Sequence, residues 1–166
     1  MKKILVFTVL FFVSLQTIAF TQTVSSDAES LPQNDQCLQL QQELKLKEKL
    51  LSDNYPELNA AFDSLIVSLT DISAMLQNRG VDTTALDKHT LLLKAKFTKL
   101  KSDRQTYHEG IKLARSYNCD LGPSLLSQEI TKLKNYSLNV KSSVADLSNY
   151  FTEVILKDLQ ELRSSR

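Results

Sequence analysis

Apolar residues recur every three or four positions from Cys37 onwards, which is the spacing of one face of an α-helix. The first apolar stripe runs to the turn at Gly80, with Lys47 as one polar residue within it and an interruption around Pro56. A second stripe covers residues 86 to 114 in an almost unbroken heptad register, and a third covers residues 126 to 162. Because no alternating strand pattern occurs, the chain is predicted to be all-α.

The three stripes predict three long arms joined by short corners. Gly80 suits the end of the first arm, and Pro123 suits the start of the third. Arms of similar length with short connections pack antiparallel, so we expect an elongated antiparallel three-helix bundle. The first helix is expected to be kinked or broken near Pro56, and the unchanged phase of its stripe favours a kink. A hairpin at Pro56 would instead give a four-helix bundle.

The N-terminus has the pattern of a secretory signal peptide. Met1-Lys2-Lys3 is basic, residues 4 to 15 are apolar, and small side chains precede an expected cleavage after Ala19, with Ala28 as second choice. We therefore predict a signal peptide at 1–19, a Ser/Thr/Gln-rich flexible tether at 20–34 and the bundle domain at 35–166. The predicted location is secreted, periplasmic or extracellular. The alternative is membrane anchoring by an uncleaved N-terminal segment.

The two cysteines of the chain, Cys37 and Cys119, are predicted to form one disulfide, since exported proteins meet an oxidising compartment. Three arms running down, up and down bring both cysteines to the same end of the bundle. A hairpin at Pro56 would leave Cys37 about 25 Å or more from that end, beyond the reach of a disulfide. Two free buried thiols, or a bridge between two chains, are the alternatives.

Composition removes several classes of function. The sequence has 3 Gly in 166 residues, and their spacing matches neither the dinucleotide-binding motif nor the P-loop motif. A formal net charge of +1 gives no global attraction to nucleic acid, and no nucleic-acid partner is expected.

The chain carries few residues with candidate chemistry. His89 and His108 are the two histidines, and they are too far apart on one helix to form a metal pair. A haem held by Met75 and His89 is the sharpest cofactor alternative, but nothing else in the sequence supports it. No cofactor and no enzymatic activity are therefore predicted.

Charge is unevenly distributed over the second arm. Residues 82 to 118 carry eight Lys or Arg and four acids, with Lys94, Lys96, Lys99 and Lys101 close together. These four lysines form either a patch for an anionic partner or the charge matching found along the edges of helical bundles. Arg104 falls on the apolar seam and is expected to extend its guanidinium to solvent and not to form a ligand site.

Three phenylalanines lie at similar distances from the predicted disulfide end of their arms. Phe62, Phe97 and Phe151 are therefore expected to come together in a central layer of the core.

The order of Cys37, Tyr55-Pro56, Gly80-Val81-Asp82 and Cys119 resembles that of secreted helical proteins without known activity, from genomes of small uncultivated bacteria. This resemblance implies export and an α-bundle, and it implies no activity. The expected function is contact with a protein or an anionic envelope polymer, and the expected membrane contact is limited to an uncleaved signal segment. A periplasmic or extracellular chaperone or stress-sensor bundle is the second hypothesis, and an enzyme or cofactor carrier is the third.

Overall fold

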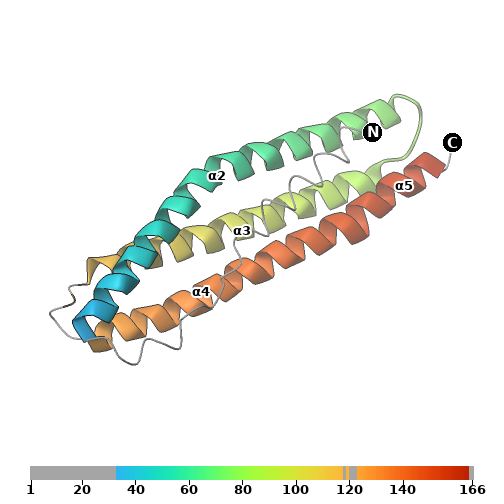
Figure 1. The fold of residues 1–166 in the computed structure, drawn as a ribbon. Coiled ribbons are helices and arrows are strands. Elements are labelled where there is room, and N and C mark those ends of the chain that lie inside the picture. Colours follow the sequence, from blue (N-terminus) through green and yellow to red (C-terminus); the bar gives the residue numbers. More distant parts are fainter. Residues whose placement is uncertain (1–32, 118, 120–122, 165–166) are drawn as a thin grey trace.

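The computed structural model describes residues 33–117, 119 and 123–164, and within them all regular structure is helical (Figure 1). The elements are α2 (Gln33–Gln77), α3 (Thr84–Ser116), α4 (Pro123–Tyr150), the π-helical turn η3 (Phe151–Ile155) and α5 (Leu156–Ser164). Because α4, η3 and α5 follow one another without a gap, they form one rod beside α2 and α3. The all-α class and the three-helix bundle are confirmed.

Two predicted segments fall almost wholly outside the described residues. They are the signal peptide at 1–19 and the tether at 20–34, of which only the last two residues are described, as the start of α2.

Helix α2 continues through Pro56, so the residues on both sides of the proline belong to one helix. The alternative of a four-helix bundle, which needs a hairpin at this point, is therefore wrong.

The corner between α2 and α3 is built as the sequence predicts. Gly80 has a φ of 77°, the left-handed conformation that glycine adopts most easily after a helix. The carbonyl of Leu76 accepts a hydrogen bond from the Val81 N–H at 3.1 Å and so closes the last turn of α2. On the other side, the Asp82 carboxylate accepts hydrogen bonds from the N–H and hydroxyl of Thr84, where α3 begins.

Helix α3 is central, since it packs against both α2 and α4 (Figure 1). Its seam contributes the most completely buried apolar side chains, among them Leu93, Leu100 and Ile111, which have no exposed surface. Gly110 lies on the same seam, and a Cβ placed there would come within 2.9 Å of Leu133 and 3.1 Å of Tyr136. The glycine therefore allows α4 to approach α3 closely at this level.

The expected phenylalanine layer is formed only in part. Phe62 and Phe97 stack with ring centroids 3.7 Å apart. Phe151 is buried, but it directly follows Tyr150, which bonds to His89 near the start of α3. Phe151 therefore lies nearer the Gly80 end of α3 than Phe97 does. The expectation counted residues from the disulfide end of each arm, and this count does not include the offset of one helix along another.

The π-helical turn η3 was not expected from the sequence. Its defining bond runs from the N–H of Leu156 to the carbonyl of Phe151, five residues earlier. Phe151 and Ile155 are both buried in the core. π-turns inside long helices often occur at functional sites, and in this turn Phe151 and Ile155 belong to the hydrophobic core.

Candidate functional site

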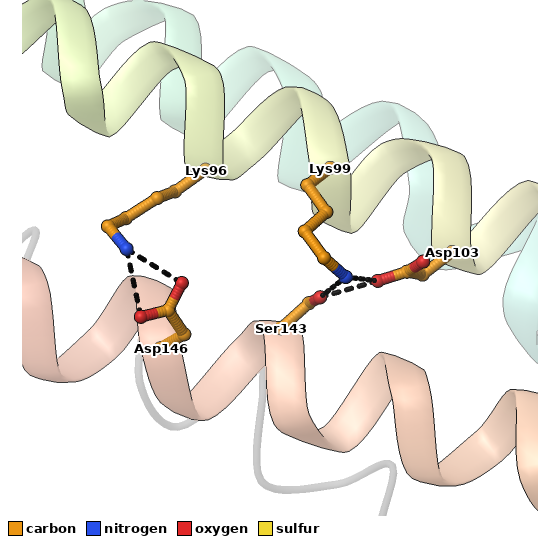
Figure 2. A network of polar contacts seen from close by, with 5 residues as sticks. All are labelled: Lys96, Lys99, Asp103, Ser143 and Asp146. Carbon is orange, nitrogen blue, oxygen red and sulfur yellow. Dashed lines mark hydrogen bonds and ion pairs between the residues drawn. The ribbon is translucent and has the colours of Figure 1, made fainter.

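The four clustered lysines of α3 do not share one face. Successive helical residues are about 100° apart, so Lys94 and Lys101 lie on one side of α3 while Lys96 and Lys99 lie nearly opposite. Lys96 and Lys99 face α4, as Figure 2 shows. The single patch suggested by proximity in the sequence is thus corrected to two pairs of lysines.

The pair on the α4 side is neutralised within the bundle (Figure 2). Lys96 donates to both carboxylate oxygens of Asp146 at 2.9 and 2.8 Å. Lys99 donates to Asp103 at 2.7 Å and to the hydroxyl of Ser143 at 2.9 Å. Burial raises the pKa of Asp103, but the hydrogen bonds from Lys99 and Ser143 and the charge of Lys99 outweigh it, so this pKa is lower than usual. Lys96 therefore has the interhelical charge matching typical of bundle edges, whereas Lys99 pairs with an acid of its own helix.

The pair on the other side is exposed. Lys101 places its ammonium 5.7 Å from the centre of the Phe97 ring. Lys112, eleven residues or about three turns beyond Lys101, falls on the same side of α3. Lys94, Lys101 and Lys112 are exposed and, within the part of the chain that the structure describes, have no ion-pair partner. We call these three residues the outer lysine row.

Cys37 and Cys119 are joined by a disulfide with their Cα atoms 5.8 Å apart, as predicted. The bond connects the first turns of α2 to the chain just beyond α3. Nearby, the Gln41 amide donates to the carbonyl of Tyr117, and Arg115 pairs with Glu48. This end of the bundle is held by covalent and polar contacts together, and a disulfide is typical of an oxidising compartment.

A pocket of about 440 Å³ opens between α2 and α3 at the level of Pro56. Its α2 wall is largely apolar and includes Leu51, Tyr55 and Pro56. Its α3 wall is polar and is formed by Arg104, Gln105, His108, Glu109 and Lys112. The volume is in the range of pockets that hold small organic molecules. We call it the Arg104 pocket.

Arg104 is the most deeply buried of the residues that line this pocket, with 3% of its surface exposed. The expectation that its guanidinium reaches solvent is therefore wrong. Its Cζ lies 5.2 Å from the centre of the Tyr55 ring, and Nε and Nη2 are buried without a hydrogen-bond partner among the described residues. Burial lowers the pKa of Arg104, and Tyr55 partly opposes this effect.

His108 is the second titratable group of the pocket. Burial and the charge of Lys112 lower its pKa, and Glu109 partly offsets them, so the ring is mainly neutral at pH 7. Its Nε2 lies 3.5 Å from the Ser52 hydroxyl and 3.9 Å from Glu48. A catalytic triad needs the acid and the hydroxyl on opposite nitrogens of the ring, whereas here both approach the same nitrogen. These three residues therefore do not have the geometry of an acyl-transfer triad.

The residues of the haem alternative are not brought together as ligands. His89 Nδ1 lies 2.6 Å from the Tyr150 hydroxyl, and Nε2 lies 3.7 Å from Asp158. Both ring nitrogens are thus engaged by the third arm, while Met75 is largely exposed. Across the described residues, no group of three or more His, Cys, Asp or Glu side chains could hold a metal ion.

The Arg104 pocket is the site that sequence reasoning missed. Two signals pointed to it: an arginine at a seam position that is otherwise apolar, and a Tyr-Pro pair in the middle of the facing arm. The sequence does not show that Arg104 lies opposite Tyr55 and Pro56, because the register between α2 and α3 comes only from the structure.

Among the helices of the described residues, none combines the length and the hydropathy that a membrane-spanning segment needs. Comparisons of the chain with family models, with curated proteins and with solved structures found no match.

Proposed function

We propose that this chain is an exported, non-catalytic helical-bundle protein that acts by contact with other molecules outside the cytosol. Export is supported by the basic and apolar pattern of residues 1–19. It is also supported by the disulfide between Cys37 and Cys119, because such bonds persist in oxidising compartments. The proposed partner is a protein or polymer with an acidic surface.

The proposed bundle is elongated and antiparallel, with a bend in α2 at Pro56. Opposite directions of α2 and α3 are supported by contacts such as Glu48 with Arg115, which join an early residue of α2 to a late residue of α3. A bend is expected because Pro56 has no N–H for the carbonyl of Ser52, four residues earlier, and its ring crowds that carbonyl. Such a rod would hold its surface charges at fixed spacings.

The contrast between two sets of lysines on one helix carries the proposed contact function. Lys96 and Lys99 are paired with carboxylates of the bundle itself. The outer lysine row extends over about 27 Å of α3, at 1.5 Å per residue, and its three residues are exposed. A partner with spaced carboxylates, phosphates or sulfates would supply the negative charges that the outer lysine row lacks within the bundle.

Retention of the secreted protein on immobilised dextran sulfate, eluted with a salt gradient, tests this surface. The double variant K94Q/K101Q should elute at clearly lower salt than the wild type. The matched control is K96Q/K99Q, which removes two charges from the same helix but from the paired side, and it should elute close to the wild type. This choice leaves Lys112, and with it the Arg104 pocket, unchanged.

Two results would contradict the proposal. If both double variants shift elution equally, net charge alone governs retention and the outer lysine row is no recognition surface. If the full chain, expressed in a secreting host, stays in the cytosol with residues 1–19 attached, export is refuted. Mass spectrometry of the fractionated protein decides the second point.

A further inference from the structure

We propose that the Arg104 pocket binds a small organic monocarboxylate, with its carboxylate on Arg104 and its apolar body against the α2 wall. This site is separate from the outer lysine row through which the contact function is proposed, apart from Lys112 at its rim. The juxtaposition that carries it is a buried, unpaired guanidinium at a pocket with one apolar and one polar wall.

The unpaired atoms of Arg104 form a binding edge. Nε and Nη2 lie along the same edge of the planar guanidinium, where one N–H group of each points in parallel. This edge matches the two oxygens of a carboxylate in a bidentate pair, which is among the strongest hydrogen-bonded arrangements in proteins. Both nitrogens are buried and lack an acceptor among the described residues.

Burial of this charge calls for an anion. Removing a cation from water is expensive unless a counter-charge and hydrogen bonds replace the lost hydration. Arg104 Cζ lies 5.2 Å from the centre of the Tyr55 ring, but such a contact supplies neither a full counter-charge nor acceptors for two N–H groups. Because Nε and Nη2 are buried, the side chains that cover them must move before an oxyanion from the pocket can supply the charge and the two acceptors.

The charge of the pocket favours a single negative charge on the ligand. Arg104 and Lys112 are cationic, Glu109 is anionic and the His108 ring is mainly neutral, so one positive charge remains. Glu109 is also held in place by the Gln105 amide at 2.9 Å. A phosphate dianion would meet too little positive charge and the nearby Glu109 carboxylate.

The opposite wall favours an apolar body on the ligand. Leu51, Tyr55 and Pro56 supply aliphatic and aromatic surface next to the polar wall. The volume of about 440 Å³ accommodates a carboxylate with one ring or a short alkyl chain. Acetate would satisfy Arg104 but leave this wall in contact with water, so it should bind more weakly than benzoate.

The test uses benzoate as probe and benzamide as its uncharged isostere. Thermal unfolding of the full mature chain should shift upward with benzoate in a saturable manner, because a ligand that binds only the folded state stabilises it. Benzamide and inorganic phosphate should give no saturable shift, and acetate should need at least tenfold higher concentration. The His108 ring resonances, followed by NMR, should move in the same titration with the same midpoint.

Variants assign the response to this pocket. R104M should weaken benzoate binding at least tenfold and should still fold, since replacing a buried charge with an apolar side chain of similar length is often neutral or stabilising. K112Q changes an exposed residue, so it keeps the fold and should weaken binding severalfold. K94Q/K101Q should bind benzoate like the wild type, which separates this site from the outer lysine row.

Three results would overturn the proposal. A benzoate response retained in R104M would place the binding elsewhere. Equal responses to benzamide and benzoate would show that the carboxylate is not recognised. No saturable response in the wild type, by unfolding and by NMR, would mean that Arg104 is satisfied without a ligand.

Discussion

Replacement of Phe97 by Ala would remove the aromatic ring at the centre of the α2–α3 interface. Phe97 is 4% exposed and stacks on Phe62, with centroids 3.7 Å apart and ring planes inclined by 10°. The variant should therefore lose the transfer free energy of the ring and also carry the cost of a cavity.

The expected loss of unfolding free energy is about 3 to 5 kcal/mol, the range for buried Phe-to-Ala changes. A stacked pair contributes about 0.5 to 1.5 kcal/mol beyond burial, so a double-mutant cycle with F62A should give a coupling of about that size. The Lys101 ammonium at 5.7 Å from the Phe97 ring is exposed and should add little.

Urea unfolding followed by far-UV circular dichroism measures these changes in the disulfide-bonded protein. The control is L91A on the same helix, because Leu91 is 65% exposed and should change the unfolding free energy by less than about 0.5 kcal/mol. A loss below about 1.5 kcal/mol for F97A with an unchanged m-value, or additive effects in the cycle, would refute the central stacked pair.

Two further predictions concern the disulfide and an ion pair. Because Cys37 and Cys119 close a loop with a sequence separation of 82, reduction should lower the unfolding free energy by up to about 4.5 kcal/mol, measured by urea unfolding with and without dithiothreitol. Alkylation of both thiols in the non-reduced protein would contradict the bond. The lowered pKa of Asp103 means that its charge stabilises the folded state above the unfolded pKa of about 3.9, and that this contribution disappears as pH falls through the folded value. The stability gap between wild type and D103N should therefore close below about pH 4, and a gap that persists to pH 2 would show that the charge is not its cause.

Helix positions in this chain can be predicted because each apolar stripe keeps its period over many turns. The corner at Gly80 is predictable for a local reason, since glycine readily adopts the positive φ that ends a helix. The pairing of Cys37 with Cys119 follows from arm lengths and direction, which do not require knowledge of side-chain contacts. These features depend on local chemistry or on simple counting.

Features that depend on the register between helices could not be predicted in the same way. Phe151 lies at a different level from Phe97 because the third arm is offset along the second. Gly110 weakens a helix when it is judged by propensity alone, whereas in the structure it admits Leu133 and Tyr136. The division of the lysine cluster is a different case. It follows from the helical angle between Lys94 and Lys96, and sequence reasoning could have found it.

Arg104 differs from the other buried polar side chains in a way that bears on selection. Ser73 bonds to Asp87, Thr90 bonds to the carbonyl of Leu86, and Ser143 bonds to Asp103. Among the described residues classed as buried, Arg104 alone has buried donor atoms without a partner. An apolar residue there would complete the seam and spare the desolvation of a charge, so stability alone does not favour arginine. Arg104 departs from the rule that seam positions are apolar, in a helix whose other seam positions largely follow it. Such a departure is expected where a residue serves binding, which is the role proposed for Arg104.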